Sequence, residues 1–165
     1  MIIETLPQLI LFILPAYFAN AVPVVLGGGT PVDFGKKFFD GKRVFGKGKT
    51  LRGFVAGVAV GSLVGLAESY LLSWPDMAYI GFLLSVGTMC GDLLGSFLKR
   101  RMGMPQGHPS FLIDQMPFFI LALAFASPFY LPTLDGIIIL AVLTYFMHVT
   151  ANFLANRAGL KKVPW

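Results

Sequence analysis

Apolar residues gather in five long runs along this chain, and short polar stretches separate the runs. A bilayer core of ~30 Å is crossed by about 20 residues of α-helix, because each residue advances a helix by ~1.5 Å. The runs have that length, so we predict an all-α, polytopic membrane protein with five transmembrane helices and a single domain over residues 1–165. The predicted helices cover Leu6–Leu26, Gly53–Leu72, Ala78–Leu98, Phe111–Leu131 and Gly136–Leu154.

The composition supports the same class of protein. Of 165 residues, 56% are hydrophobic and 13% are charged, and the mean hydropathy is +0.75. A soluble domain of this size cannot enclose so large an apolar fraction in one core, so much of the apolar surface must face lipid. Cys90 is the single cysteine, which excludes a disulfide framework and a cysteine-based metal site.

The basic residues predict the orientation in the membrane. All thirteen Lys and Arg lie after the first, third and fifth runs, and the acidic Glu4, Asp76 and Asp135 are left for the other face. Cytoplasmic segments are enriched in Lys and Arg, so we expect a multi-pass cell-membrane protein with its N-terminus outside and its C-terminus in the cytoplasm. The basic set comprises Lys36, Lys37, Lys42, Arg43, Lys47, Lys49, Arg52, Lys99, Arg100, Arg101, Arg157, Lys161 and Lys162.

One face of the third run is polar. Residues at i, i+3, i+7, i+11 and i+14 fall on one side of a helix that turns by about 100° per residue. A carboxylate inside a membrane helix is costly unless it is paired or hydrated, so Asp92 is a candidate functional residue; the alternative is a structural ion pair with Lys99 or Arg100. The polar face consists of Ser85, Thr88, Asp92, Ser96 and Lys99.

Glycines recur at every fourth position in the second and third runs. Small residues at this spacing let helix backbones approach closely. We therefore predict that the two runs form a tight two-helix scaffold that turns Asp92 inward. The glycines are Gly53, Gly57, Gly61 and Gly65 in the second run, and Gly87, Gly91 and Gly95 in the third.

Two further polar features lie in the first and fifth runs. Thr144, His148 and Asn152 share a face of the fifth run, where His148 is expected to form an interhelical hydrogen bond rather than to bind metal. Asn20 lies between Pro15 and Pro23. Proline disturbs helical hydrogen bonding, so backbone carbonyls near Asn20 could face a cavity.

The loop before the second run combines glycines, which free the backbone to offer N–H groups, with many basic residues. Its Gly48-Lys49-Thr50 ending is not a P-loop, because the G-x-x-x-x-G-K-[ST] spacing requires a glycine where Arg43 stands. Thr50 and Arg52 open the second run, and a helix N-terminus favours anions. The alternative is a flexible, solvated basic loop.

A second carboxylate, Asp114, lies at the cytoplasmic start of the fourth run. Asp92 and Asp114 could meet across one pocket. Mg²⁺ typically takes one or two carboxylates and completes its octahedron with water and phosphate oxygens. We therefore expect a cytoplasm-facing site for Mg²⁺ and a polyphosphate within the helix bundle.

A resemblance to known families appears around these carboxylates. The signature of the CTP-dependent phosphatidate cytidylyltransferases is similar to Gly91-Asp92-Leu93-Leu94-Gly95-Ser96-Phe97-Leu98-Lys99-Arg100, followed by Gly107-His108 and Asp114. Those enzymes are longer and carry Gly-His-Gly-Gly and a further Asp, whereas this chain has His108-Pro109-Ser110 and Gln115. Over essentially its whole length the chain resembles the compact CDP-archaeol synthase family of archaeal ether-lipid synthesis, also through Asp33, Asp40-Gly41-Lys42-Arg43 and Gly48-Lys49-Thr50-Leu51-Arg52-Gly53.

The resemblance implies transfer of CMP from CTP to the isoprenoid glycerophosphate lipid 2,3-bis-O-(geranylgeranyl)glycerol 1-phosphate, with release of pyrophosphate. It implies Mg²⁺ as cofactor on the catalytic carboxylates Asp92 and Asp114. The expected partners are CTP, this lipid and the bilayer, with no nucleic acid, and the oligomeric state is left open. The residues expected to bind CTP or phosphate are Asn20, Lys42, Arg43, Lys49, Thr50, Arg52, Ser96, Lys99 and Arg100.

Three alternatives have different standing. A phosphatidate cytidylyltransferase acting on a diacyl lipid shares the carboxylate signature. A small membrane transporter could use the same polar faces, but such proteins often show two related halves, which this sequence lacks. A CDP-alcohol phosphotransferase would carry an Asp-Gly…Ala-Arg…Gly…Asp…Asp motif, which is absent.

Overall fold

The computed structural model describes residues 5–106, 108 and 110–160, and it confirms the all-α class. Within these residues there are five helices and no strand, with two isolated β-bridges in the loop between the first two helices. Glu4, Gly107, Pro109, Lys161 and Lys162 lie outside the described residues. The helices are α1 (Leu6–Leu26), α2 (Leu51–Leu71), α3 (Met77–Arg101), α4 (Phe111–Ala126) and α5 (Leu134–Arg157).

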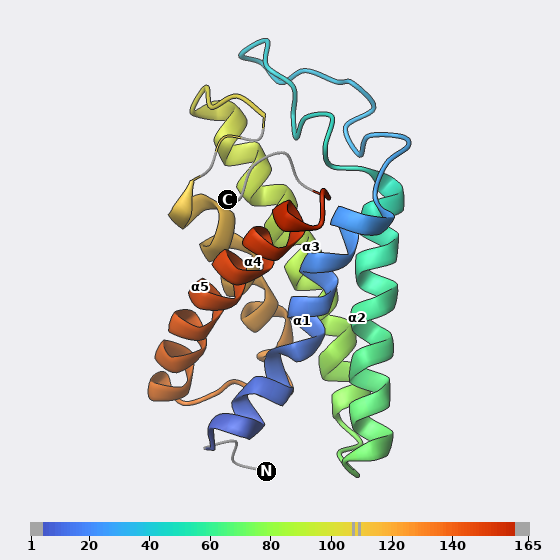
Figure 1. The fold of residues 1–165 in the computed structure, drawn as a ribbon, viewed down its shortest axis with the longest axis vertical. Helices are drawn as coiled ribbons and strands as arrows, with labels where there is room; N and C mark the ends of the chain where they lie inside the picture. Colours follow the sequence, from blue (N-terminus) through green and yellow to red (C-terminus); the bar gives the residue numbers. More distant parts are fainter. Residues whose placement is uncertain (1–4, 107, 109, 161–165) are drawn as a thin grey trace.

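Successive helices run in opposite directions (Figure 1). The α1–α2 loop and the α3–α4 connection therefore lie together at the end of the bundle away from the start of α1, and α5 ends toward the same side (Figure 1). Helix α3 packs against α1, α2 and α4, whereas α5 makes few contacts with α1 and α4. The basic segments between α1 and α2 and at the end of α3, which were predicted to share one face of the membrane, thus share one end of the bundle, and Arg157 lies at the end of α5.

Four of the five helices, α1, α2, α3 and α5, are long and apolar enough to cross a membrane. Helix α4 is apolar but has 16 residues, so it extends over about 24 Å. It ends at Ala126 instead of the predicted Leu131, because Pro128 has no N–H to continue the helical hydrogen bonds. The Ala124 carbonyl accepts the Ser127 hydroxyl instead, at 2.8 Å. The crossing predicted for the fourth run is therefore shorter than a full span in the described helix.

The glycines of α2 allow close contacts with both α1 and α3. A Cβ on Gly61 would stand 2.1 Å from the Ser85 hydroxyl oxygen and 2.7 Å from the Pro15 carbonyl oxygen. A Cβ on Gly65 would stand 2.7 Å from the Cα of Gly81. Helix α2 thus packs closely against both α1 and α3, with no room for a larger residue at these glycines.

The glycines of α3 differ from the prediction in the helix that they contact. They were expected to pack against α2, but a Cβ on Gly87 would meet Leu121 and Ala122 of α4, at 2.4 Å from the Leu121 carbonyl oxygen. A Cβ on Gly91 would meet the Cα of Phe118 at 2.3 Å. The predicted close packing of the second and third runs is confirmed through the α2 glycines, which lie against α3. The predicted partner of the α3 glycines Gly87, Gly91 and Gly95 is wrong, because they contact α4.

Two of these contacts involve carbonyl groups that proline leaves without an intrahelical donor. Pro23 has no N–H for the carbonyl of Ala19, and that oxygen would be 2.7 Å from a Cβ on Gly57. Pro117 likewise has no N–H for Ile113, whose carbonyl oxygen would be 2.6 Å from a Cβ on Gly95. The neighbouring helix covers both carbonyls with a glycine, so the prolines are accommodated without breaking α1 or α4.

Gly91→Val should destabilise the bundle by about 1–3 kcal/mol, because the added isopropyl group would meet the α4 backbone, which cannot rotate away. Ala59→Val is the matched control, since Ala59 is exposed on α2. The thermal unfolding midpoint in detergent should fall for Gly91→Val and stay near the wild-type value for Ala59→Val. Equal midpoints for the two variants would contradict the close α3–α4 contact.

Candidate active site

The predicted carboxylates are held at the loop-bearing end of the bundle, and each is paired with a lysine. Asp92 of α3 accepts hydrogen bonds from Lys49 of the α1–α2 loop. Asp114, in the first turn of α4, forms an ion pair with Lys99 of α3. The α3 glycines that contact α4 fix the relative position of the two helices that carry these carboxylates.

The Lys49 ammonium contacts both oxygens of Asp92 at 2.6 Å. The Lys49 and Asp92 side chains are 29% and 23% exposed, so water reaches the pair. A single cation centred on both carboxylate oxygens occupies the place that a bidentate metal ion would take. The alternative pairing of Asp92 with Lys99 or Arg100 is not what the structure shows.

Asp114 is oriented by its own helix and by α3. One of its oxygens accepts a hydrogen bond from the Ser110 backbone N–H at 3.0 Å, at the start of α4. Lys99 pairs with the other oxygen and also donates to the His108 carbonyl at 2.9 Å. A carboxylate in the first turn is favoured by the helix dipole, so Asp114 is held in place while staying 30% exposed.

Arg43 lies against Asp33 of the same loop. Its guanidinium donates to both oxygens of Asp33, with the Nε contact at 3.3 Å. The same carboxylate accepts backbone N–H groups from Gly35, Phe45 and Gly46 at 3.0, 3.1 and 2.9 Å. Burial alone would raise the pKa of Asp33, but the Arg43 charge and these three donors hold its pKa well below the usual aspartate range.

Three other predicted ligands have their polar groups engaged in the fold. Lys42 donates to the Arg101 carbonyl at 3.2 Å, and Arg100 donates to the Pro105 carbonyl at 3.2 Å. Thr50 caps α2, because its hydroxyl oxygen accepts the Gly53 N–H at 3.1 Å. The Thr50 oxygen also accepts the Gly28 N–H at 3.2 Å, which ties the end of α1 to the start of α2.

The remaining predicted residues near this end are Arg52 and Ser96. Arg52 is exposed in the first turn of α2, and Ser96 is half-buried one turn beyond Asp92 on α3. The polar face of α3 continues into the bundle with Ser85 and Thr88, which are fully buried. Ser85 donates to the Gly81 carbonyl of its own helix at 2.6 Å, so its hydroxyl is satisfied within α3.

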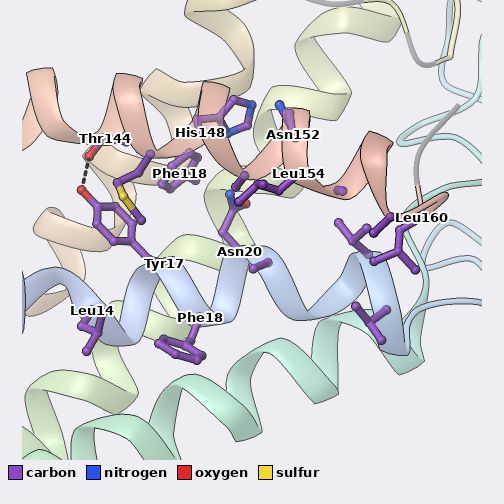
Figure 2. Close-up of a pocket in the computed structure, with 17 residues that line it drawn as sticks. Leu14, Tyr17, Phe18, Asn20, Phe118, Thr144, His148, Asn152, Leu154 and Leu160 are labelled. Atoms are coloured by element: carbon purple, nitrogen blue, oxygen red, sulfur yellow. Dashed lines mark hydrogen bonds between the residues drawn. The ribbon is translucent and has the colours of Figure 1, made fainter. Parts of the chain in front are cut away.

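Asn20 lies in a separate cavity between α1 and α5 (Figure 2). The cavity has a volume of about 440 Å³ and is mostly apolar, and none of the predicted aspartates or basic residues lines it. Thr144, His148 and Asn152 of α5 reach it from the opposite wall, as their shared face predicts, and the hydroxyls of Tyr17 and Thr144 are hydrogen-bonded at 3.0 Å (Figure 2). The structure therefore does not bring Asn20 together with Asp92.

Sequence reasoning did not assign a role to Asp33 or to Arg101. Arg101 donates to Asp40 at 2.6 Å and to the Arg43 carbonyl at 2.6 Å, and its guanidinium lies 4.9 Å from the Phe38 ring centroid. Arg101 thereby fastens the loop to the end of α3. No spacing rule links residues 33 or 40 to their partners, because the contacts are made by an irregular loop.

Comparison with known proteins places this arrangement. A family model for CarS-like CDP-archaeol synthases matches residues 2–165. Proteins named CDP-archaeol synthase from Pyrococcus horikoshii and Pyrococcus abyssi are each 50% identical over 159 residues, which covers 93% of this chain and 94% and 95% of the relatives. A solved structure of an intramembrane enzyme for archaeal membrane lipid biosynthesis superposes with a TM-score of 0.86 at 38% identity, over 91% of this chain and 96% of that one.

The apolar helices and the paired charges at one end of the bundle define a membrane-embedded enzyme of lipid biosynthesis. The match extends over nearly the whole chain and is far above the level at which a fold alone is shared. The chain belongs to the CDP-archaeol synthase family.

The hydrogen bonds that the Asp33 carboxylate accepts from the loop, here called the Asp33 cluster, should weaken in acid. Because the folded pKa lies below the unfolded value, the cluster stabilises the loop above the unfolded pKa of ~3.9, and the stabilisation is lost progressively as pH falls below it. Hydrogen exchange of the Phe45 and Gly46 amides, corrected for the intrinsic pH effect, should accelerate below about pH 4. The Leu51 amide, which donates to the Thr30 carbonyl, is the internal control. Unchanged protection from pH 5 to pH 2 would contradict this assignment.

Proposed function

We propose that this chain transfers CMP from CTP to 2,3-bis-O-(geranylgeranyl)glycerol 1-phosphate, giving CDP-archaeol and pyrophosphate at the cytoplasmic face of the cell membrane. The observation that carries the proposal is the pair of lysine-bound carboxylates, Asp92 and Asp114, at the basic end of a family member's helix bundle. Both substrates are phosphate anions, and the concentration of Lys and Arg at this end suits them.

The reaction forms one bond and breaks one bond. An oxygen of the lipid phosphate attacks the α-phosphorus of CTP, and the bond from that phosphorus to the bridging oxygen of the β-phosphate breaks. The nucleophile is already an anion, so no general base is required. The demand on the protein is to align two mutually repelling anions and to stabilise the charge that gathers on the departing pyrophosphate.

Mg²⁺ fits the donors that the chain offers. Asp92 and Asp114 are hard oxygen ligands, and a cation already lies on each of them as Lys49 and Lys99. Within residues 5–106, 108 and 110–160 no group of three His, Cys, Asp or Glu could hold a metal by itself, so phosphate oxygens or water would complete the coordination. When bound by Asp92 and Asp114, Mg²⁺ would neutralise charge on the triphosphate.

The basic residues divide by how they are held. Lys49 and Lys99 would turn from the carboxylates toward phosphate, and Arg52, which is exposed in the first turn of α2, would add a further cation. Ser96 and the Thr50 hydroxyl proton would add hydrogen bonds. Lys42, Arg43 and Arg100 already contact loop groups. The charges of Lys42 and Arg100 would act on the bound anions at longer range, whereas the Arg43 charge is opposed by the Asp33 carboxylate.

The α1–α5 cavity is a suitable place for an isoprenoid chain of the lipid. Its volume of about 440 Å³ lies within the ~300–1,000 Å³ of ordinary ligand sites, and its walls are mainly apolar. Asn20 and Asn152 lie in this cavity, where their amides would meet the polar glycerol region of the lipid. On this account Asn20 serves the lipid rather than the nucleotide.

Asp92→Asn and Asp114→Asn should each reduce CMP transfer at least about 100-fold, because the amide removes the charge that opposes a bound cation. Asp76→Asn is the matched control, since Asp76 is an exposed aspartate at the other end of α3. Product formation from labelled CTP and the ether lipid is measured in samples with unchanged thermal unfolding. Full activity of either site variant would contradict the assignment of that carboxylate.

Ala151→Trp should fill the cavity and raise the KM for the lipid about tenfold, while the KM for CTP changes little. Ala151 lines the cavity, whereas Val142 is exposed on the same helix. Val142→Trp therefore serves as the control for adding an indole to α5. A rise in the KM for CTP, or no effect on the lipid KM, would remove the cavity from the lipid-binding site.

A further inference from the structure

The carboxylate of Asp33 is the most enclosed charge in the α1–α2 loop. Its side chain is fully buried, although the loop around it is largely exposed. It accepts hydrogen bonds from Gly35, Phe45 and Gly46 and from the Arg43 guanidinium. Five contacts to one carboxylate, from both sides of the loop, give it the bonding of a structural centre rather than of a ligand for substrate.

The backbone connects this centre to Lys49 by two routes. The Lys49 N–H donates to the Gly46 carbonyl at 3.4 Å, and Gly46 is itself held by Asp33. The Lys49 carbonyl accepts the N–H of Val32, next to Asp33, at 2.8 Å. The Lys49 backbone is therefore fixed on both of its polar groups by residues that Asp33 orders, and its side chain extends from there to Asp92.

The same contacts indicate a structural role for Arg43. A guanidinium that binds a fully buried carboxylate leaves that carboxylate unpaired if it moves away, which is strongly unfavourable. Arg43 is thus held by Asp33 at 23% exposure instead of being displayed to solvent. Its contribution is to complete the Asp33 centre.

We propose that Asp33, with Arg43 as its partner, is the positioning residue of the proposed CMP transfer, and that it acts by placing Lys49 against the Asp92 end of the bundle. The inference rests on the proposed function. In this proposal Asp33 touches neither substrate. It affects how tightly the triphosphate is bound, whereas Asp92 and Asp114 act in the bond-forming step. Asp33→Asn would keep one acceptor oxygen but would place an N–H group against backbone N–H donors, so the loop would lose hydrogen bonds that hold its conformation.

Asp33→Asn is compared with Asp40→Asn. Asp40 makes a matched control because it lies in the same loop and also pairs with an arginine, Arg101, but has no bond to the Lys49 segment. The KM for CTP should rise about tenfold or more in Asp33→Asn, with kcat within about twofold of wild type, and should stay near the wild-type value in Asp40→Asn. Unchanged KM in Asp33→Asn, or an equal rise in both variants, would overturn the proposal.

Arg43→Met completes a double-mutant cycle. If Arg43 acts through Asp33, the double variant should raise the KM for CTP no further than Asp33→Asn alone, because both changes disable one unit. If Arg43 bound phosphate directly, the two effects would multiply, and the proposal would be overturned.

A measurement without CTP separates this inference from the proposed function. Hydrogen exchange at Phe45 and Gly46 should accelerate in Asp33→Asn and in Arg43→Met, and not in Asp40→Asn. If Asp33→Asn does not fold, Arg43→Met alone decides: a raised KM with unchanged exchange would identify Arg43 as a direct phosphate ligand and overturn the proposal. Absence of CMP transfer by folded wild-type protein would overturn the proposed function and leave the exchange result standing.

Discussion

Close approach of helix backbones at glycine is the constraint on which the rest of the molecule depends. Helix α3 has neighbours on several sides, and glycines on α2 or on α3 itself leave no room for a Cβ at these contacts. In lipid the apolar side chains gain little from being buried in protein, so intimate backbone packing must supply much of the association. The distance between the α3 and α4 backbones sets where Asp92 and Asp114 stand.

Proline and glycine work together in this packing. Ala19 and Ile113 have carbonyls that Pro23 and Pro117 cannot satisfy, and in both cases a glycine of the next helix brings its backbone against the oxygen. Each contact of this kind is weak, but it covers a carbonyl oxygen that would otherwise have no partner in the water-free interior of the bundle. They connect two features that look like opposite tendencies in the sequence: residues that interrupt a helix, and residues that let two helices meet.

The charged end of the bundle is organised as a set of carboxylate–cation pairs. Two pairs join an aspartate on a membrane helix to a lysine, at Asp92 and Asp114. Two others, at Asp33 and Asp40, shape the loop and attach it to α3. Excess basic residues then face outward. On the proposed function, anionic substrates would meet a site whose cations are already gathered by carboxylates, which would limit the reorganisation needed on binding.

Hydropathy and charge were sufficient to predict the five helices and the gathering of basic segments at one end, because each depends on residue type alone. The start of α2 at Leu51 follows from the Thr50 cap, and the early end of α4 follows from Pro128. Helical spacing shows that Gly87 and Gly91 share a face of the helix, but it does not show which neighbouring helix that face contacts. The Asp33 centre was missed because a loop folds by contacts without periodicity.

The most direct test of the central claim uses purified wild-type protein with labelled CTP, Mg²⁺ and either 2,3-bis-O-(geranylgeranyl)glycerol 1-phosphate or a diacyl phosphatidate, with CDP-lipid and pyrophosphate measured together. The account predicts equal amounts of both products, dependent on CTP, metal and lipid, with the ether-linked isoprenoid lipid preferred. A folded sample that forms no product with either lipid would contradict it. Preference for the diacyl lipid would contradict the substrate assignment.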